Sequence, residues 1–459
     1  MNRIHPDDFI STDELARWQQ DLDDRGLRAT GSAEHASYIA DLADRLEAAG
    51  VRDVHLEPIP FQRWAPRIWS LQVDGTDVPV TSYASYSGST GPQGVAGPLS
   101  AVPTAGTIGV IQVTPPVMPS AMFDSLDWGA PALPLHAEGY NPNTPYKRLW
   151  LPNGISEQLV LFEEAGAAGL ILVIDLPEEQ VRGGYLVYDG VFRDLPTLIV
   201  SGEAGAAILN GTDAHLTLDA EVVSTITHNV VGTIPGRSDE LVVLQSHTDG
   251  TNGVEDNGPE AIIAMAEHLA RRDDLARGVV VLLSAGHFAI ELAWGVEAWL
   301  AAHKDDLVPK VAAAICLEHL GALPSRSDVE CGTDVSPYEF GAFFSSPHPV
   351  IIDLLRASLD RAEVTESLVL RPFVPLPGNP AVMMWPGDGG PFWHTAGLPA
   401  GNFITGPDYL LNVEPVMEFI DVDALRRQAI AFTELILDLT DADWDDLHRH
   451  APLATVANG

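Results

Sequence analysis

Cysteine is scarce in this 459-residue sequence, which argues against a fold held together by disulfides. Only Cys316 and Cys331 occur, whereas small secreted scaffolds rely on several paired cysteines. Cys316 lies within the apolar run 311–317, a setting typical of a thiol buried in a protein core. We therefore expect neither a disulfide framework nor a metal site built on sulfur.

Positive charge is scarce as well. Lys and Arg number 25 against 64 Asp and Glu, so the formal net charge is −39. A surface of this sign repels phosphate groups, so we expect no nucleic-acid partner and no binding to an anionic membrane surface.

Long apolar runs are also lacking. No stretch approaches the ~20 apolar residues of a membrane helix, and the first residues lack the apolar segment of a secretory signal. These features predict a cytoplasmic protein. With 46% hydrophobic residues, the chain still has enough apolar side chains for a large folded core.

The pattern of apolar residues differs between parts of the chain. Residues 67–225 contain short β-like runs between Pro- and Gly-rich loops. After them, apolar strands alternate with helical segments, which predicts an α/β fold with a mostly parallel, mixed sheet flanked by helices. The clearest strands expected there are 241–245, 279–283, 311–317 and 400–404. The domains expected are a main domain at 1–66 and 226–445, a β-rich insertion at 67–225 and a polar tail at 446–459.

The first cluster of polar residues follows the predicted strand 241–245, at the edge of the sheet where α/β proteins bind ligands. His247 is of the type that ligates a metal or acts as a general base. Asp249, two residues later, is placed to orient that imidazole. Asp256 precedes a predicted helix, where acids often only cap the helix, yet it can fold back to the same edge.

The predicted strand 311–317 ends in Glu318 and His319. A carboxylate buried there is costly unless it is paired or bound to a cation. Because successive strand residues face opposite sides, we expect only one of the two to enter the site. If that residue is Glu318, His319 faces the other side as a buried, hydrogen-bonded side chain.

Two further loops carry candidate residues. His287 and Glu291 follow the predicted strand 279–283 at a spacing that suits one helical face. Asp388 and His394 belong to a Gly-rich loop, where they are candidates for contact with a substrate, as is His319. Histidines and carboxylates without cysteine, at several strand ends, predict a catalytic site for a divalent metal such as zinc or manganese.

The order of these motifs resembles the zinc aminopeptidase and glutamate-carboxypeptidase-type metallopeptidases over about residues 11–440. The likeness rests on Arg28-Ala-Thr-Gly-Ser32, residues 229–236, the His247-Thr248-Asp249 motif and Asp256-Asn257-Gly258. It implies a zinc-aminopeptidase-like fold. Within the middle segment, residues 106–113, 163–173 and 195–200 resemble a protease-associated (PA) domain, which in that family is inserted beside the active site.

The resemblance also implies roles for individual residues. His247, Asp256 and Glu318 match the ligands of the first metal. Asp249 matches the acid that orients the histidine, and Asp388 matches a loop acid near the site.

This sequence departs from the family pattern at the second metal. The Glu-Glu pair expected after the strand 279–283 is absent, and Gly286-His287-Phe288 stands there instead. The late histidine ligand expected near residues 409–412 is absent too. We therefore expect one divalent ion, most simply zinc, rather than two. The general base is then His287 or Glu291, with His287 as a fourth ligand the alternative.

These features predict a metal-dependent hydrolase that performs water or acyl-transfer chemistry at an amide-type carbonyl of a small-molecule or peptide-like substrate. Two alternatives stay open. The chain is a catalytically inactive metallopeptidase-like scaffold that binds a partner, or its metal assists chemistry on a non-peptide amide, ester or C–C bond. A homo-oligomer is compatible with either.

Overall fold

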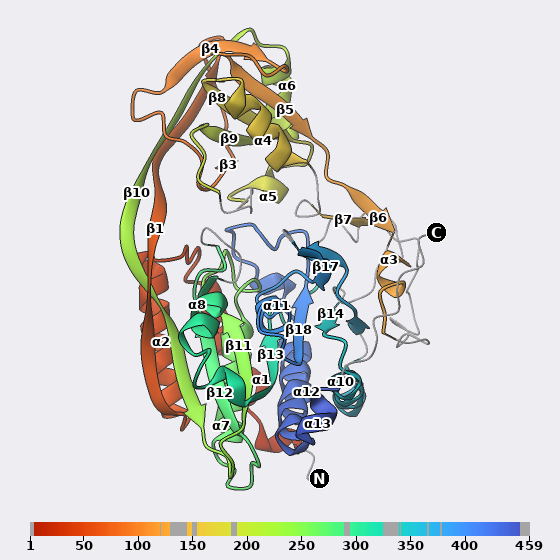
Figure 1. The fold of residues 1–459 in the computed structure, drawn as a ribbon. Helices are drawn as coiled ribbons and strands as arrows, with labels where there is room; N and C mark the ends of the chain where they lie inside the picture. The colour runs from red at the N-terminus through yellow and green to blue at the C-terminus, as the bar shows by residue number, and fades with distance from the viewer. Residues whose placement is uncertain are drawn as a thin grey trace.

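The computed structural model describes residues 4–119, 121–128, 145–148, 154–184, 191–288, 294–324, 339, 341–364, 367–376 and 379–449. Figure 1 shows two lobes, an upper one that carries β3, β4, β5, β8, β9 and the helices α4 to α6, and a lower one that carries the N- and C-terminal parts of the chain. The helix α3 lies beside the lower lobe. The two long strands β1 and β10 run side by side from one lobe into the other.

The N-terminal elements, the upper lobe and the elements β6, α3 and β7 come first in the chain. Their bounds are η1 (Pro6–Asp8), α1 (Thr12–Asp23), α2 (Ala33–Ala48), β1 (Arg52–Val73), β2 (Thr76–Val78), β3 (Ser82–Tyr83), β4 (Val95–Ser100), β5 (Ile108–Val113), β6 (Val117–Pro119), α3 (Ala121–Asp124), β7 (Pro145–Lys147), α4 (Ile155–Glu164), β8 (Gly169–Ile174), α5 (Glu178–Val181), β9 (Thr197–Ser201), α6 (Gly202–Leu209) and β10 (Asp213–Ile234).

The rest of the lower lobe follows. Its elements are β11 (Leu241–His247), α7 (Gly258–Leu269), β12 (Gly278–Ser284), α8 (Trp294–Ala302), η2 (Val308–Lys310), β13 (Val311–Leu317), β14 (Gly341–Ser345), α10 (Pro349–Arg361), β15 (Ser367–Leu370), β16 (Val374–Leu376), β17 (Asn379–Met384), α11 (Gly390–His394), β18 (Ala400–Thr405), η3 (Met417–Phe419), α12 (Val422–Asp441) and α13 (Trp444–Leu447).

Within the described residues, one sheet has 14 strands in the order β15-β14-β18-β13-β11-β12-β10-β4-β5-β8-β9-β3, with β1 paired to β10 and β2 paired to β1. In the lower lobe, β12, β11, β13 and β18 are parallel neighbours. β10 is antiparallel to β12, and β14 is antiparallel to β18 but parallel to β15. The expected mostly parallel, mixed sheet flanked by helices is thereby confirmed.

Helices cover both faces of the lower sheet, which explains its continuous apolar strands. Every residue of β11, β12 and β13 is buried. Side chains alternate between the two faces of a strand, so Val242 and Leu244 pack in the core with α7 and α12, while Val243 packs in the core with α8 and Phe392 of α11. The two cores hold the strand ends in place.

The upper lobe has its own cores and its own set of parallel strands. β4, β5, β8 and β9 are parallel neighbours. Residues of β5, β8 and β9 are buried in two separate apolar clusters, and the partly buried Val95 and Leu99 of β4 pack against one of them. The boundaries expected at residues 66 and 225 fall inside β1 and β10, which run without a break between the lobes. The resemblance of this region to a PA domain stays a prediction.

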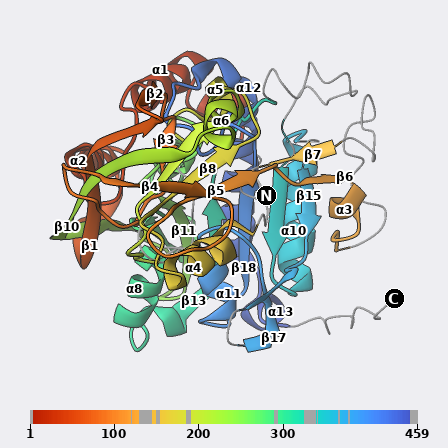
Figure 2. The same cartoon turned by 90° about the horizontal axis from the view of Figure 1, so that it is seen from above.

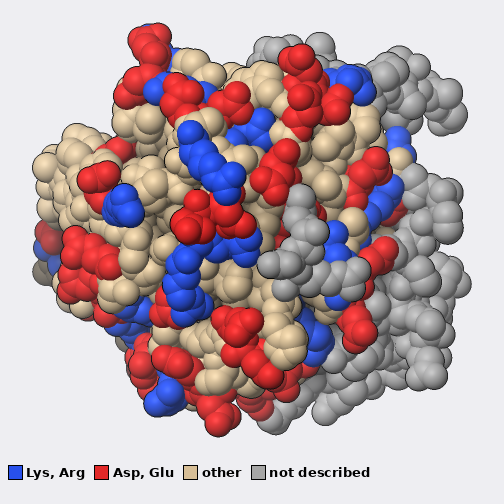
Figure 3. Space-filling view, turned by 90° about the horizontal axis from the view of Figure 1, so that it is seen from below, with Lys and Arg blue, Asp and Glu red and all other residues tan. Residues whose placement is uncertain are grey.

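Seen from above, the upper-lobe strands cross over the lower lobe (Figure 2). Acidic and basic side chains are interspersed on the lower face of the molecule (Figure 3). Among the described residues, no helix combines the length and apolar character needed to cross a bilayer.

Candidate metal centre

Three histidines meet at the carboxyl ends of neighbouring strands. His247 is the last residue of β11, His287 follows β12, and His319 follows β13. Since β11 lies between β12 and β13 and is parallel to both, these ends share one edge of the sheet. This edge is where open α/β sheets bind their ligands.

His247, Glu255 and His319 form a group whose potential ligand atoms all lie within 4.8 Å of one another. Glu255 Oε1 lies 3.9 Å from His247 Nε2 and 3.8 Å from His319 Nε2. The two Nε2 atoms and Glu255 Oε2 are buried without a hydrogen-bond partner. Buried polar atoms are costly to leave unpaired, and a divalent cation is a group that would satisfy all three.

The other ring nitrogen of each ligand histidine is fixed by a backbone carbonyl. His247 Nδ1 donates to the carbonyl of Asp249 at 3.0 Å, and His319 Nδ1 donates to the carbonyl of Thr405 at 2.7 Å. A carbonyl only accepts, so Nδ1 carries the proton and the lone pair of Nε2 points into the group. Both rings are therefore prepared as neutral metal ligands.

The charge states of the group also suit a metal. Burial, together with the neighbouring His287, lowers the pKa of His247. Burial raises the pKa of Glu255, but His247 and His287 outweigh it, so the net shift is downward. An ionised carboxylate beside a neutral imidazole is the form in which these side chains bind a metal.

His287 lies beside this group and is paired with Asp388. Its Nδ1 lies 2.7 Å from Asp388 Oδ1, its Nε2 lies 3.0 Å from Glu255 Oε1, and its ring stacks on His247 at 3.9 Å. Burial lowers the pKa of His287, but the Asp388 and Glu255 carboxylates raise it well above its usual value overall. Asp388, expected to touch a substrate, therefore orients and charges His287 instead.

The carboxylate of Asp249 holds the loop that carries His287. Its Oδ1 accepts the N–H groups of Gly286 and His287, its Oδ2 accepts that of Phe288, and the hydroxyl of Thr30 donates to it as well. The expectation that this carboxylate orients His247 is thus corrected, because only the backbone carbonyl of Asp249 bonds to that ring.

The expected ligand Asp256 is directed away from the group. Both of its oxygens bond to Arg28, with Arg28 Nε 2.7 Å from Oδ2 and Nη2 bonded to Oδ1. Burial lowers the pKa of Arg28, but Asp256 outweighs it and raises the pKa overall. The neighbouring Glu255, which sequence reasoning missed, takes the place in the group that was assigned to Asp256.

The assignments of Glu318 and His319 are exchanged in the structure. Glu318 Oε1 accepts the thiol of Cys316 at 3.0 Å and the N–H of Asp388 at 2.7 Å, so this carboxylate supports the Asp388 loop. His319 has a φ of 55°, which ends the extended strand geometry on which the alternation argument depended. The turn brings the imidazole, instead of the carboxylate, into the group.

The remaining candidates lie elsewhere. His394 ends α11, is half-buried, and its Nδ1 lies 3.1 Å from the hydroxyl of Thr395. It is not part of the group. Glu291, the alternative base, lies outside the described residues.

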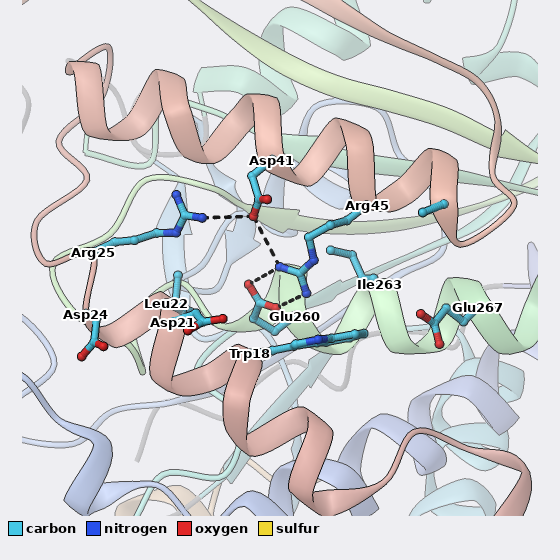
Figure 4. A pocket seen from close by; sticks show the side chains of 11 residues that line it. Trp18, Asp21, Leu22, Asp24, Arg25, Asp41, Arg45, Glu260, Ile263 and Glu267 are labelled. Carbon is cyan, nitrogen blue, oxygen red and sulfur yellow. Dashed lines mark hydrogen bonds and ion pairs between the residues drawn. The ribbon is translucent and has the colours of Figure 1, made fainter.

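A separate groove of about 630 Å³ lies between α1, α2 and α7 (Figure 4). Its arginines are paired within the groove, Arg25 with Asp41 at 3.1 Å and Arg45 with the buried Glu260. These pairs tie the helices to one another.

No protein-family model and no curated protein matches this sequence. Solved structures match its fold. BSAP, a zinc aminopeptidase from Bacillus subtilis, is 15% identical with a TM-score of 0.68 over 95% of this chain and 97% of that one. A peptidase M28 precursor from Shewanella amazonensis SB2B is 17% identical with a TM-score of 0.63 over 94% and 96% of the two chains.

A third similar structure is the aminopeptidase from Aneurinibacillus sp. strain AM-1, 14% identical with a TM-score of 0.60 over 93% of each chain. The similarity covers nearly the whole length of this chain, both lobes included. The protein therefore has the fold of zinc aminopeptidases and of an M28 peptidase.

Proposed function

We propose that this protein is a metal-dependent hydrolase with one divalent ion, zinc by preference, acting on an amide-type carbonyl of a small-molecule or peptide-like substrate. The observation that carries the proposal is the group of His247, Glu255 and His319, with its unpartnered ligand atoms at the carboxyl ends of parallel strands. Two histidines and one glutamate are a ligand set of catalytic zinc sites, which keep a further position open.

A divalent ion held there would lower the pKa of water toward ~7 and polarise a carbonyl group. The protein's own part is to supply a base. His287 presents Nε2 at the edge of the group, 3.0 Å from Glu255 Oε1, while Asp388 fixes the opposite nitrogen. A histidine oriented by a carboxylate accepts a proton from water and holds it as an imidazolium.

His287 is assigned as the base and not as a fourth ligand for a geometric reason. It does not belong to the group whose ligand atoms are all within 4.8 Å of one another. Its ring is instead held between Asp388 and Glu255, whose carboxylates raise its pKa, so His287 accepts a proton as a base only when the pH is above that raised pKa.

One observation favours a second candidate, a metal-stabilised scaffold without catalysis. The side chains of His247, Glu255, His287, His319 and Asp388 are each at most 5% exposed. Side chains this deeply buried leave a substrate little access, as expected of a scaffold without catalysis.

The first experiment measures metal content and turnover together. The full-length protein is purified without chelators or a His-tag, and bound metal is counted by inductively coupled plasma mass spectrometry. We expect about one zinc per chain, loss of that zinc in His319→Ala, and its retention in His303→Ala, a control at the far end of α8 that pairs with Glu57.

The same samples are assayed with aminoacyl anilides, amides and esters. Turnover by the wild type that disappears in His319→Ala supports the hydrolase. Zinc without turnover favours the scaffold, and failure to take up any divalent ion contradicts both.

A further inference from the structure

One side chain of the upper lobe reaches the loop that carries His287. Tyr86 follows β3 and is buried, and its hydroxyl donates to the carbonyl of Phe288 at 2.8 Å. A buried tyrosine hydroxyl requires such a partner. The hydrogen bond joins two parts of the chain that are 202 positions apart.

Phe288 is the residue that borders His287 in sequence and in space. Its ring packs edge-on against the His287 ring, with centroids 4.9 Å apart and an interplanar angle of 75°. Its N–H donates to Asp249 Oδ2 at 3.0 Å. The backbone of Phe288 is thus fixed by Asp249 on one side and by Tyr86 on the other.

Tyr86 is itself held rigidly in the upper lobe. Its carbonyl accepts the N–H of Arg193 at 2.9 Å, and its ring packs edge-on against Phe192 at 5.1 Å. Its φ of 59° is a left-handed conformation that bulky side chains seldom adopt. Strained backbone of this kind persists only where its surroundings enforce it, and it is enriched at functional sites.

We propose that Tyr86 is a positioning residue for His287, supplied to the lower-lobe site by the upper lobe. The inference rests on the proposed role of His287 as the base. Loss of the Tyr86 hydroxyl removes this hydrogen bond to the carbonyl of Phe288, so we expect the His287 ring to sample positions away from the group. Errors of about 1 Å in the position of a reacting group lower rates by up to ~10²-fold.

The test compares Tyr86→Phe with Tyr83→Phe in the full-length, zinc-loaded protein. Tyr83 lies in β3 of the same lobe, and its ring packs against Trp64 and Trp69, so the same chemical change is made away from His287. Three quantities are measured: amide hydrogen exchange of peptides covering residues 286–288, zinc affinity, and kcat and KM for the substrate found above.

Tyr86→Phe is expected to raise exchange in residues 286–288 by ~10-fold, as local opening becomes easier, and to lower kcat by ~10-fold with little change in KM. Zinc affinity should stay at the wild-type value in both variants. Tyr83→Phe should leave all three quantities unchanged.

Wild-type exchange and kcat in Tyr86→Phe would overturn the inference. An equal, chain-wide rise in exchange in both variants would also overturn it, because that is the result of a purely structural role. If the wild type binds zinc but turns over no substrate, the proposed function fails. The exchange measurement alone then decides whether Tyr86 positions the His287 loop. A rise confined to residues 286–288 then still supports positioning, and no rise refutes it.

Discussion

Arg28 and Asp256 form a fully buried ion pair in which both carboxylate oxygens are bonded to one guanidinium. Arg28 also donates to the carbonyl of Asn252 at 2.8 Å, and its N–H bonds to the carbonyl of Gly250. The arginine thereby holds the loop between His247 and α7. With Asp256 turned toward Arg28, the adjacent Glu255 is the carboxylate that faces the histidines.

Replacement of Glu255 distinguishes between two ligand sets: the one in the structure, which contains Glu255, and the one suggested by the sequence, which contains Glu318. Glu255→Gln should weaken zinc binding by about 100-fold or more, since even residues behind the ligands change metal affinity by 10- to 100-fold. Glu318→Gln is the matched control, because its carboxylate bonds to Cys316 and to the Asp388 loop. Competition with a zinc chelator gives both affinities. Equal losses in the two variants would contradict the assignment.

Removal of Arg28 tests the buried pair itself. Burial raises the pKa of Asp256 to about 7 even beside Arg28. Arg28→Met leaves this buried carboxyl without its partner, either charged or forced to take up a proton, so we expect the free energy of unfolding to fall by about 3–5 kcal/mol. The double variant Arg28→Met/Asp256→Leu removes both charges and should recover much of this loss. Urea unfolding of these two variants and of Asp256→Leu gives the free energies of a double-mutant cycle. If the double variant is no more stable than Arg28→Met, the broken ion pair is not the cause of the lost stability.

Replacement of Asp388 tests the orientation of His287. Asp388→Asn keeps the shape of the side chain but removes the charge that pairs with His287 Nδ1, so kcat should fall by about 10²–10⁴-fold. Because this carboxylate raises the pKa of His287, the acid limb of the pH–rate profile should move to lower pH. Zinc content, measured in parallel, should be unchanged. An unaltered profile with full kcat would exclude His287 as the base.

His35 makes the stability of the fold depend on pH. The Gly31 N–H donates to its Nδ1 at 3.0 Å and its Nε2 lies 2.8 Å from Thr248 Oγ1, an arrangement that suits the neutral ring. Burial outweighs the opposing effect of Asp249 and lowers the pKa of His35 to about 4. The unfolded chain, with a pKa near ~6.5, therefore binds the proton more readily between these values.

Stability should consequently fall as the pH drops from about 6.5 toward 4, by about 3 kcal/mol from this residue. His35→Gln is expected to be less stable at neutral pH and to lose this part of the pH dependence. The exposed His55→Gln is the control and should keep it. Denaturant unfolding between pH 4 and 7 makes the comparison, and an identical slope in His35→Gln would refute the assignment.

Much of the architecture could be read from the chain. The apolar runs at 241–245, 279–283 and 311–317 predicted β11, β12 and β13, because a parallel sheet covered on both faces requires strands that are apolar on both sides. The same runs located the edge at which His247, His287 and His319 meet. The long ribbon of β1 and β10 is not evident from the chain alone, since Pro58, Pro60 and Pro66 interrupt the pattern of β1.

The sequence by itself thus determined the class of fold, the edge of the sheet where the candidate site lies, and the placement of His247 and His287 at that edge. Only the tertiary structure decided which acid and which further histidine join them. Glu255 and Asp256 are adjacent acids, and their directions depend on Arg28, which is 228 positions from Asp256. His319 replaces Glu318 because a positive φ reverses the alternation of the strand. Neighbouring residues of similar chemistry are distinguished by distant partners and by local backbone geometry, and neither is encoded in residue spacing.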